Sequence, residues 1–213
     1  MSAVAKKAHA NFSQEEASRA IYVDFEGFKD KTPSLVGILV EGVLTQVVLD
    51  PRLFPAAVVK GCKPGSVQDV ARDLRERCHT EGRTLVAYSG HELRTFATYS
   101  GVDFSDVYRN ALLIARRWWN VFHYGEPIDR KLKTFLAVMG IPMPAALGVG
   151  NATSRLRAVI DMLERRHTYG ALTPVVRKKW RDLLAYNAHD CRGTQRLVSR
   201  AVRELAERSQ QQA

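Results

Sequence analysis

The sequence predicts a mixed α/β domain with a partly antiparallel sheet, and three observations support this fold class. Three runs rich in valine, isoleucine and leucine follow one another between residues 20 and 50. An amphipathic segment and a fourth apolar run come next, and the rest of the chain has helical patterning interrupted by glycine and proline. Three strands, then a helix and a strand, then helices form the order of an α/β layout whose sheet is not fully parallel.

The predicted strands begin near the N-terminus. Residues 20–27 read AIYVDFEG, a short apolar run that is interrupted by acids and closed by glycine. Residues 34–41 (SLVGILVE) and 44–50 (LTQVVLD) predict two further strands, and the short link between them predicts an antiparallel hairpin or meander. Residues 83–88 (RTLVAY) predict the fourth strand. The first three strands are therefore expected to be antiparallel.

The predicted helices are recognised by apolar spacing and end signals. Apolar residues recur at intervals of three and four over residues 67–78, with Ser66 as the N-cap. Gly101 is expected to end the next helix, and Gly140 with Pro142 a later one. The further helices are expected over residues 91–99, 106–119, 128–139, 153–166 and 174–207, the last interrupted or bent around Asn187.

One domain is expected over residues 20–207, with a flexible N-terminal segment at 1–19 and a frayed tail at 208–213. A chain of 213 residues that is 46% hydrophobic can bury one substantial core. Its three cysteines are an odd number without CxxC pairs, which argues against a disulfide framework or a zinc site and favours a reducing, cytoplasmic setting. We expect no membrane association, because no apolar run approaches the length of a membrane span.

The net charge favours nucleic acid as the partner. Thirty-two lysines and arginines against twenty-two acids give a formal charge of +10 and a pI near 9.8. Such a charge creates a field that attracts polyanions, although it can also serve solubility alone. A cluster of carboxylates is unexpected in so basic a chain and therefore calls for a functional explanation.

Asp24 and Glu26 are separated by one residue on the first predicted strand. Side chains alternate between the two faces of a strand, so both carboxylates are expected on one side, with Ile21, Val23 and Phe25 facing the core. Like charges this close repel each other unless a cation neutralises them, and hard carboxylate oxygens suit magnesium or manganese. The alternative is an acid pair on the solvent face of an edge strand, without function.

Two further segments carry an acid or a phenol that can join this pair. Residues 85–92 read LVAYSGHE, which places Glu92 in a first helical turn at the carboxyl end of a strand. In the late helix, Tyr186 and Asp190 are four residues apart and share one face, whereas His189 points about 100° away and is treated as a bystander. The structural alternatives are an ordinary helix-start glutamate, a core tyrosine and an exposed helix acid.

Together these segments resemble the motifs of the DEDD superfamily of 3′-to-5′ exonucleases. Residues 21–27 are similar to the first motif, with its DxE acids, and residues 186–190 match the tyrosine form of the third motif, Y-x3-D. The stretch LLAYNAHDCRGTQRLV is still more similar to the YN-x2-D helix of YprB-type and RecB-associated predicted ribonuclease H-like nuclease domains. Residues 88–92 (YSGHE) and 131–141 extend the resemblance, which spans residues 21–202.

The resemblance implies a ribonuclease H-like fold and a metal-dependent hydrolase, a 3′-to-5′ exonuclease that cuts DNA or RNA with two Mg²⁺ or Mn²⁺ ions. Tyr186 is implied to orient the attacking water. The implied metal ligands and catalytic acids are Asp24, Glu26, Glu92 and Asp190.

The second motif is where the sequence departs from the pattern. The proofreading branch of the superfamily has aspartate where Glu92 stands, and Asp103 and Asp106 are alternatives for this ligand, although Asp106 is more similar to the structural aspartate that follows the motif. Two other functions therefore stay open. One is a nucleic-acid-binding module of the same fold with weak or no catalysis, and the other is a structure-selective endonuclease.

Contacts to the substrate are expected from basic and aromatic residues, because cations neutralise phosphates and aromatic rings stack on unpaired bases. The alternative for each cluster is a solvated cationic face over a buried tryptophan. The candidates are Arg116, Arg117, Trp119, Arg166, Lys178, Lys179 and Arg181.

Overall fold

A mixed sheet forms the centre of the computed structural model, which describes residues 12–28, 32–147 and 151–212. In this part of the chain the sheet has six strands in the order β4-β3-β2-β1-β5-β6. The strands are β1 (Ile21–Gly27), β2 (Pro33–Val40), β3 (Val43–Val48), β4 (Lys63–Pro64), β5 (Leu85–Ala87) and β6 (Tyr108–Asn110). β2 is antiparallel to β1 and to β3, whereas β5 is parallel to β1, and β6 to β5. The predicted α/β class and the antiparallel pairing of the first three strands are confirmed.

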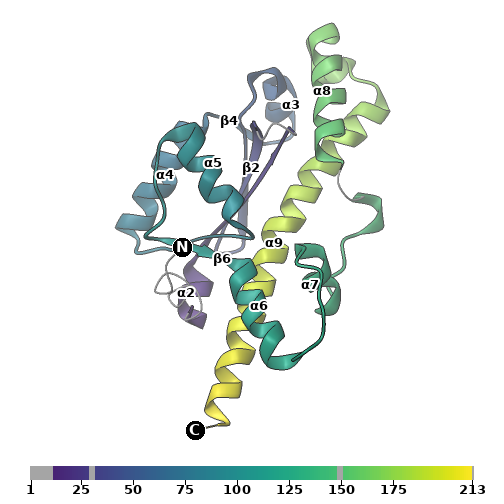
Figure 1. Cartoon of the computed structure of the whole chain (residues 1–213). Helices are drawn as coiled ribbons and strands as arrows, with labels where there is room; N and C mark the ends of the chain where they lie inside the picture. The colour runs from purple at the N-terminus through teal and green to yellow at the C-terminus, as the bar shows by residue number, and fades with distance from the viewer. Residues whose placement is uncertain (1–11, 29–31, 148–150, 213) are drawn as a thin grey trace.

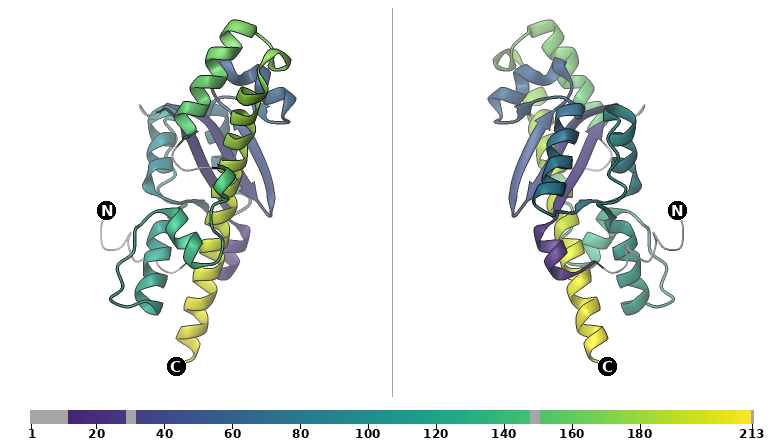
Figure 2. Two further views of the ribbon diagram at one scale, coloured as in Figure 1. Left: turned by 90° about the vertical axis from the view of Figure 1, so that its right-hand side faces the viewer. Right: turned by 90° about the vertical axis from the view of Figure 1, so that its left-hand side faces the viewer.

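Helices cover both faces of this sheet. The helices of the described chain are α2 (Gln14–Arg19), α3 (Phe54–Val59), α4 (Val67–Thr80), α5 (Gly90–Ser100), α6 (Ala111–Phe122), α7 (Leu132–Val138), α8 (Ala152–Arg166) and α9 (Pro174–Gln210). In Figure 2, α9 lies on one side of the sheet, and α4 and α5 lie on the other. Because side chains alternate along β1, the strand contributes to the core on both faces of the sheet. Val23 packs into the core under α4 and α5, whereas Tyr22 packs into the core under α9.

α9 is a continuous helix of 37 residues, about 55 Å long, and it crosses the whole molecule (Figure 1). Its first half packs with α8 around Trp180, and its second half packs with α6 and α7 around Leu197. The interruption expected at Asn187 is wrong. The Asn187 carboxamide is bonded to other elements, so it does not compete for the helix's own backbone groups.

Two other predicted boundaries need correction. The helix predicted over residues 106–119 is instead strand β6 followed by α6, because Tyr108–Asn110 pairs with β5 as a parallel strand before Asn110 caps the helix. The helix predicted over 128–139 is shorter and consists of α7 alone, since residues 126–131 before it form an irregular segment that contains Pro127.

Within the part of the chain that the structure describes, none of the helices combines the length and the apolar character that a membrane span requires.

Parts of the two predicted end segments are helical where the structure describes them. Within the segment predicted to be flexible, α2 begins with a Ser13–Glu16 capping box, and Phe12 and Ala17 are buried. The Tyr22 hydroxyl donates to the Ala17 carbonyl at 2.7 Å, which attaches α2 to the sheet. The predicted tail begins inside α9, which ends at Gln210. Residues 1–11, 148–150 and 213 lie outside the described residues.

Gly37 lets α9 approach the sheet closely, directly beside Asp24 on the neighbouring strand. A Cβ at this position would lie 2.4 Å from Asn187 Oδ1 and 2.7 Å from Cys191 Sγ, and both partners are fully buried. Gly37→Ala is therefore expected to destabilise the protein by about 1–3 kcal/mol, the range for overpacking a core. Urea unfolding measures this change, and Gly170→Ala is the control, because a Cβ there meets nothing within 4 Å. An unchanged unfolding midpoint for Gly37→Ala would contradict this packing.

Candidate metal centre

The alternation of β1 places Asp24 and Glu26 on the sheet face that α9 covers. The residue between them, Phe25, points to the opposite face and packs edge-on against Phe96 of α5, with ring centroids 5.0 Å apart. Both acids therefore lie on one side of the strand, as predicted. This face is not the solvent face of an edge strand, because β1 lies inside the sheet between β2 and β5 and Glu26 is 8% exposed.

α9 brings the third carboxylate to the same place. Asp190, Asp24 and Glu26 each offer a carboxylate oxygen, and these three oxygens lie within 4.8 Å of one another. We call these three residues the carboxylate cluster. Two of its members come from the first strand and one from the last helix, so the cluster exists only in the folded chain. Its spacing is one that can hold a metal ion.

Asn187 fixes the position of Asp24. Its Nδ2 donates to the Asp24 backbone carbonyl at 3.0 Å and to Asp24 Oδ2 at 2.9 Å. Its Oδ1 accepts from Gln46 Nε2 at 2.9 Å, and the same Gln46 amide donates to the Leu184 carbonyl. The fully buried carboxamide thus ties β1, β3 and α9 together at the cluster. Sequence reasoning did not assign Asn187 or Gln46 to the site, although an asparagine in mid-helix, one turn after an apolar leucine, was a signal.

The cluster has more negative charge than its surroundings compensate. Burial raises the pKa of Asp24 well above its usual value, the charges of Glu26 and Asp190 add to this rise, and the Asn187 hydrogen bond opposes it. Burial likewise raises the pKa of Glu26 to about 8, with a further rise from Asp190, while Arg155 lowers it. Protons or a cation must therefore neutralise part of this charge.

Arg155 is the cation of α8 that faces Glu26, and sequence reasoning missed it. It lies in the first turns of the helix and is 8% exposed, with its guanidinium donating to the Leu147 carbonyl. The neighbouring Thr153 hydroxyl donates to the Gly27 carbonyl at 3.2 Å, which holds the start of α8 against the end of β1. A helix-start arginine carries no sequence signal that separates a buried charge partner from a solvated one.

Glu92 lies near the cluster but does not belong to the three converging carboxylates. Its Oε2 accepts from the backbone N–H and the hydroxyl of Ser89, both at 3.3 Å, in the capping box of α5. Burial raises its pKa to about 7, and its charge contributes to the raised pKa of Asp24 and Glu26. Of the four predicted ligands the structure therefore brings three together, and the fourth stays within electrostatic reach as a helix cap.

The two aspartates considered as alternatives to Glu92 lie elsewhere. Both Asp106 oxygens face Arg75, at 2.7 and 2.9 Å, in an exposed pair between α4 and the start of β6. Asp103 accepts from the backbone N–H and hydroxyl of Ser105 in a surface turn. Neither aspartate belongs to the carboxylate cluster.

Two neighbours on α9 contact Asp190. The Tyr186 hydroxyl hydrogen-bonds the Asp190 carboxylate, as the shared helix face predicted, and burial together with the nearby acids raises the pKa of this phenol. His189 Nδ1 lies 3.5 Å from Asp190 Oδ1, so this side chain contacts the Asp190 carboxylate and does not point clear of it as expected. The helix directs adjacent side chains apart, but the imidazole is long enough to turn toward its neighbour's carboxylate.

The predicted nucleic-acid contacts divide between buried and peripheral positions. Trp119 is 7% exposed, stacks on His123 and donates from Nε1 to the Glu126 carbonyl, so its faces are not open to bases. Arg166 ends α8, about 16 Å along the helix from Arg155. Lys178 pairs with Asp182 at 2.7 Å near the start of α9. The other predicted contacts are half-buried or exposed at Arg116, Arg117, Lys179 and Arg181.

A row of basic residues that begins beside Asp190 on α9 was also missed. A cavity of about 220 Å³ lies beside α9 and is lined by His189, Arg192 and Arg196, with Leu147 and Pro144 opposite. These three basic residues follow one another at intervals of three and four along one helix face. The spacing can be read from the sequence, but the position of these side chains relative to Asp190 in the folded protein cannot.

Comparisons of this chain with protein-family models, with curated proteins and with solved structures found no match.

The raised pKa of Glu26 predicts how stability depends on pH in the absence of metal. The folded protein holds a proton on Glu26 up to about pH 8, whereas the usual pKa is 4.5. The stabilisation from this group is therefore fully present below pH 4.5 and is lost as the pH rises through about 8. In a chelator, Glu26→Gln is expected to be more stable than wild type at pH 8, by on the order of 1 kcal/mol, with the gain shrinking toward pH 5.

Urea unfolding over this pH range measures the difference, and Glu76→Gln on the exposed face of α4 controls for a charge change away from the cluster. A variant that loses stability at pH 8 would contradict the assignment of Glu26 to an uncompensated acidic cluster.

Proposed function

We propose that this chain is a metal-dependent nuclease that hydrolyses nucleic-acid phosphodiester bonds by a two-metal mechanism. The observation that carries the proposal is the convergence of Asp24, Glu26 and Asp190, within 4.8 Å, from the first strand and the last helix. The central sheet, with its antiparallel first three strands, parallel β5 and β6 and flanking helices, supports a ribonuclease H-like fold.

The donor set of the cluster fits hard divalent cations. All three groups are carboxylates, which suit Mg²⁺ and Mn²⁺ and lack the nitrogen and sulfur ligands that zinc prefers. The buried thiol of Cys191 lies on α9 beside Asp190, but burial raises its pKa well above its usual value, so it stays a neutral thiol. The raised pKa of Asp24 and Glu26 marks charge that a cation would compensate.

Each residue has a role in this proposal. Asp24, Glu26 and Asp190 hold the ions, with Asn187 keeping the Asp24 carboxylate in place and Glu92 adding negative charge behind them. When bound, two such ions acidify the attacking water and stabilise the charge on the leaving oxygen. Tyr186 keeps its phenolic proton, because burial raises its pKa, and while this proton is bonded to Asp190 the phenolic oxygen can accept a hydrogen bond from the attacking water.

The surroundings of the cluster support a polyanionic substrate. The cavity lined by His189, Arg192 and Arg196 begins one residue from Asp190 on α9. Arginine side chains form paired hydrogen bonds to phosphates, and the apolar residues Pro144 and Leu147 offer a surface for sugars or bases. We propose that a nucleic-acid strand approaches the carboxylates along this row of basic residues.

Action on a 3′ end rests on the resemblance of residues 186–190 to the tyrosine form of the third exonuclease motif. The experiment is a nuclease assay with end-labelled single- and double-stranded DNA and RNA, with Mn²⁺ or with chelator, and with free or blocked 3′ ends. Mn²⁺-dependent shortening from free 3′ ends is expected. Cleavage that ignores a blocked end would instead identify an endonuclease on the same metals, and no cleavage of any substrate would contradict the proposed activity.

A second candidate is a catalytically weak nucleic-acid-binding module of the same fold. One observation favours it: the Glu92 carboxylate is used to cap α5 and is not among the converging oxygens. Isothermal titration with Mn²⁺ at neutral pH separates the two candidates. Undetectable metal binding, together with retained binding of single-stranded DNA, would favour the binding module.

A further inference from the structure

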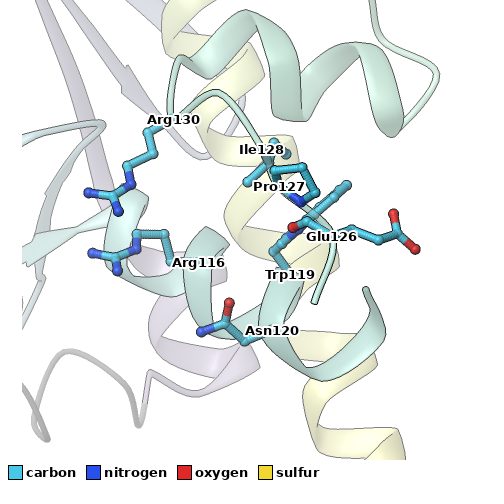
Figure 3. Close-up of a pocket in the computed structure, with 7 residues that line it drawn as sticks. All are labelled: Arg116, Trp119, Asn120, Glu126, Pro127, Ile128 and Arg130. Carbon is cyan, nitrogen blue, oxygen red and sulfur yellow. The ribbon is translucent and has the colours of Figure 1, made fainter. Parts of the chain in front are cut away.

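A second concave site lies between α6 and the segment 126–130 that leads into α7 (Figure 3). Its cavity has a volume of about 320 Å³, at the lower end of the range for ligand sites. We call it the α6 pocket. The residues that matter here are Arg116, Trp119, Asn120, Pro127, Ile128 and Arg130.

The walls of the α6 pocket are fixed without a ligand. On α6, Arg116, Trp119 and Asn120 stand at spacings of three and four, so they share one face of the helix. Trp119 Nε1 donates to the Glu126 carbonyl at 2.9 Å, and the Tyr88 hydroxyl donates to the Arg130 carbonyl at 2.6 Å. Both ends of the segment 126–130 are therefore held by side chains of other elements. A ligand would not have to order this segment, which favours binding.

The pocket carries positive charge that nearby acids do not neutralise. Figure 3 shows the side chains of Arg116 and Arg130 extending to the same side and the Glu126 carboxylate pointing to the other. Glu126 lies 3.5 Å from His123 Nδ1, and Asp129 pairs with Lys131 at 2.7 Å. Among the described residues, no carboxylate forms an ion pair with either arginine. Two guanidinium groups on one side of a cavity, without an ion-paired carboxylate in the described part of the chain, are arranged for an anion.

We propose that the α6 pocket binds a phosphate group carried by a nucleotide or by the end of a nucleic-acid strand. The planar forks of Arg116 and Arg130 match the oxygens of a phosphate, and the Asn120 amide adds a further donor. Pro127 and Ile128 form an apolar wall for the sugar or base that carries the phosphate.

This inference does not need the carboxylates, because no member of the carboxylate cluster lines the α6 pocket. It also bears on the proposed nuclease function, because one residue, Tyr88, connects the α6 pocket to the turn that leads to Glu92. The Tyr88 carbonyl accepts from Leu112 N at 2.9 Å at the start of α6, and its hydroxyl holds Arg130. The next residue, Ser89, is the N-cap of α5 and forms the capping box with Glu92. The α6 pocket and the capping box of Glu92 are therefore attached to the same end of β5.

Isothermal titration of the full chain tests the proposal with three probes at about 0.15 M ionic strength. The probes are adenosine monophosphate, a 5′-phosphorylated trinucleotide and the same trinucleotide with a 5′ hydroxyl. We expect the phosphorylated trinucleotide to bind at least about tenfold more tightly than its hydroxyl form, because a charged hydrogen-bonded pair is lost without the phosphate. Adenosine monophosphate that binds as tightly as the phosphorylated trinucleotide would identify a free nucleotide as the ligand, and weaker binding would identify a strand end.

Variants separate this pocket from a general charge effect. The double variant Arg116→Ala/Arg130→Ala is expected to lose the preference for phosphate, and Arg116→Lys/Arg130→Lys to retain only part of it, because lysine lacks the paired donors. Arg72→Ala removes the same charge from the exposed face of α4, away from the α6 pocket, and should keep the preference. Circular dichroism and Mn²⁺ binding should be unchanged in every variant.

Two results would overturn the proposal: no preference of the wild type for any phosphate-bearing probe, or an equal loss in Arg72→Ala. Its failure is distinguishable from failure of the nuclease proposal, which would appear as lost Mn²⁺ binding with phosphate binding retained.

Discussion

Asp24→Asn and Asp190→Asn are each expected to reduce Mn²⁺-dependent cleavage of end-labelled nucleic acid by on the order of 10³-fold. Each change removes one of the three converging carboxylates while keeping the size of the side chain. The loss follows because a metal ion that stabilises transition-state charge contributes several kcal/mol, and each 1.4 kcal/mol is about a factor of ten in rate. Initial rates at saturating Mn²⁺ measure the effect.

Asp103→Asn is the matched control for this loss. It makes the same chemical change at an exposed aspartate that caps a surface turn outside the cluster. Its activity should equal that of wild type, and the thermal unfolding of all three variants should remain cooperative. Full activity in both Asp24→Asn and Asp190→Asn would refute the assignment, and a comparable loss in Asp103→Asn would show that the assay does not report on the cluster.

Mn²⁺ is expected to raise the unfolding temperature, and the rise should grow between about pH 6 and about pH 8. Protons compete with the metal for the same oxygens, since the pKa of Glu26 is raised to about 8 and that of Asp24 is raised well above its usual value. At roughly 100 times the dissociation constant, binding adds about 2.7 kcal/mol, which corresponds to roughly 5–10 °C for a domain of this size.

Calorimetry at several pH values, with Mn²⁺ and with chelator, measures this shift. Asp190→Asn should lose most of it, whereas Asp103→Asn should show the wild-type response. A shift that stays constant across the pH range, or that survives in Asp190→Asn, would place the bound metal outside the carboxylate cluster.

The sequence was sufficient to predict β1, β2, β3 and β5, and for β1 also the facing of the side chains, because alternation is a local property. Asp24 and Glu26 share a face as their spacing requires, and Tyr186 reaches Asp190 as a four-residue helical spacing predicts. The three-residue strand β6 could not be foreseen, since Tyr108–Asn110 is too short for a periodic pattern and owes its conformation to pairing with β5.

Contacts between distant elements were beyond what local patterns determine. The sequence predicts an interruption or bend of the helix at Asn187, but the carboxamide of this residue joins β1, β3 and α9 by hydrogen bonds that form only in the tertiary fold. Arg155 and Arg192 looked like many other arginines in a basic chain. For Glu92, in contrast, the local pattern was informative. Its position in the first turn of a helix was predicted correctly, and at this position its carboxylate caps the helix.

The central claim is that the three carboxylates hold divalent metal ions. Crystals grown with Mn²⁺ near pH 8 and measured for anomalous scattering would test it most directly. We expect anomalous density about 2.0–2.3 Å from carboxylate oxygens of Asp24, Glu26 and Asp190, with a second ion about 3.5–4 Å from the first. Ordered carboxylates with no anomalous density between them, at Mn²⁺ concentrations that support cleavage, would contradict the account.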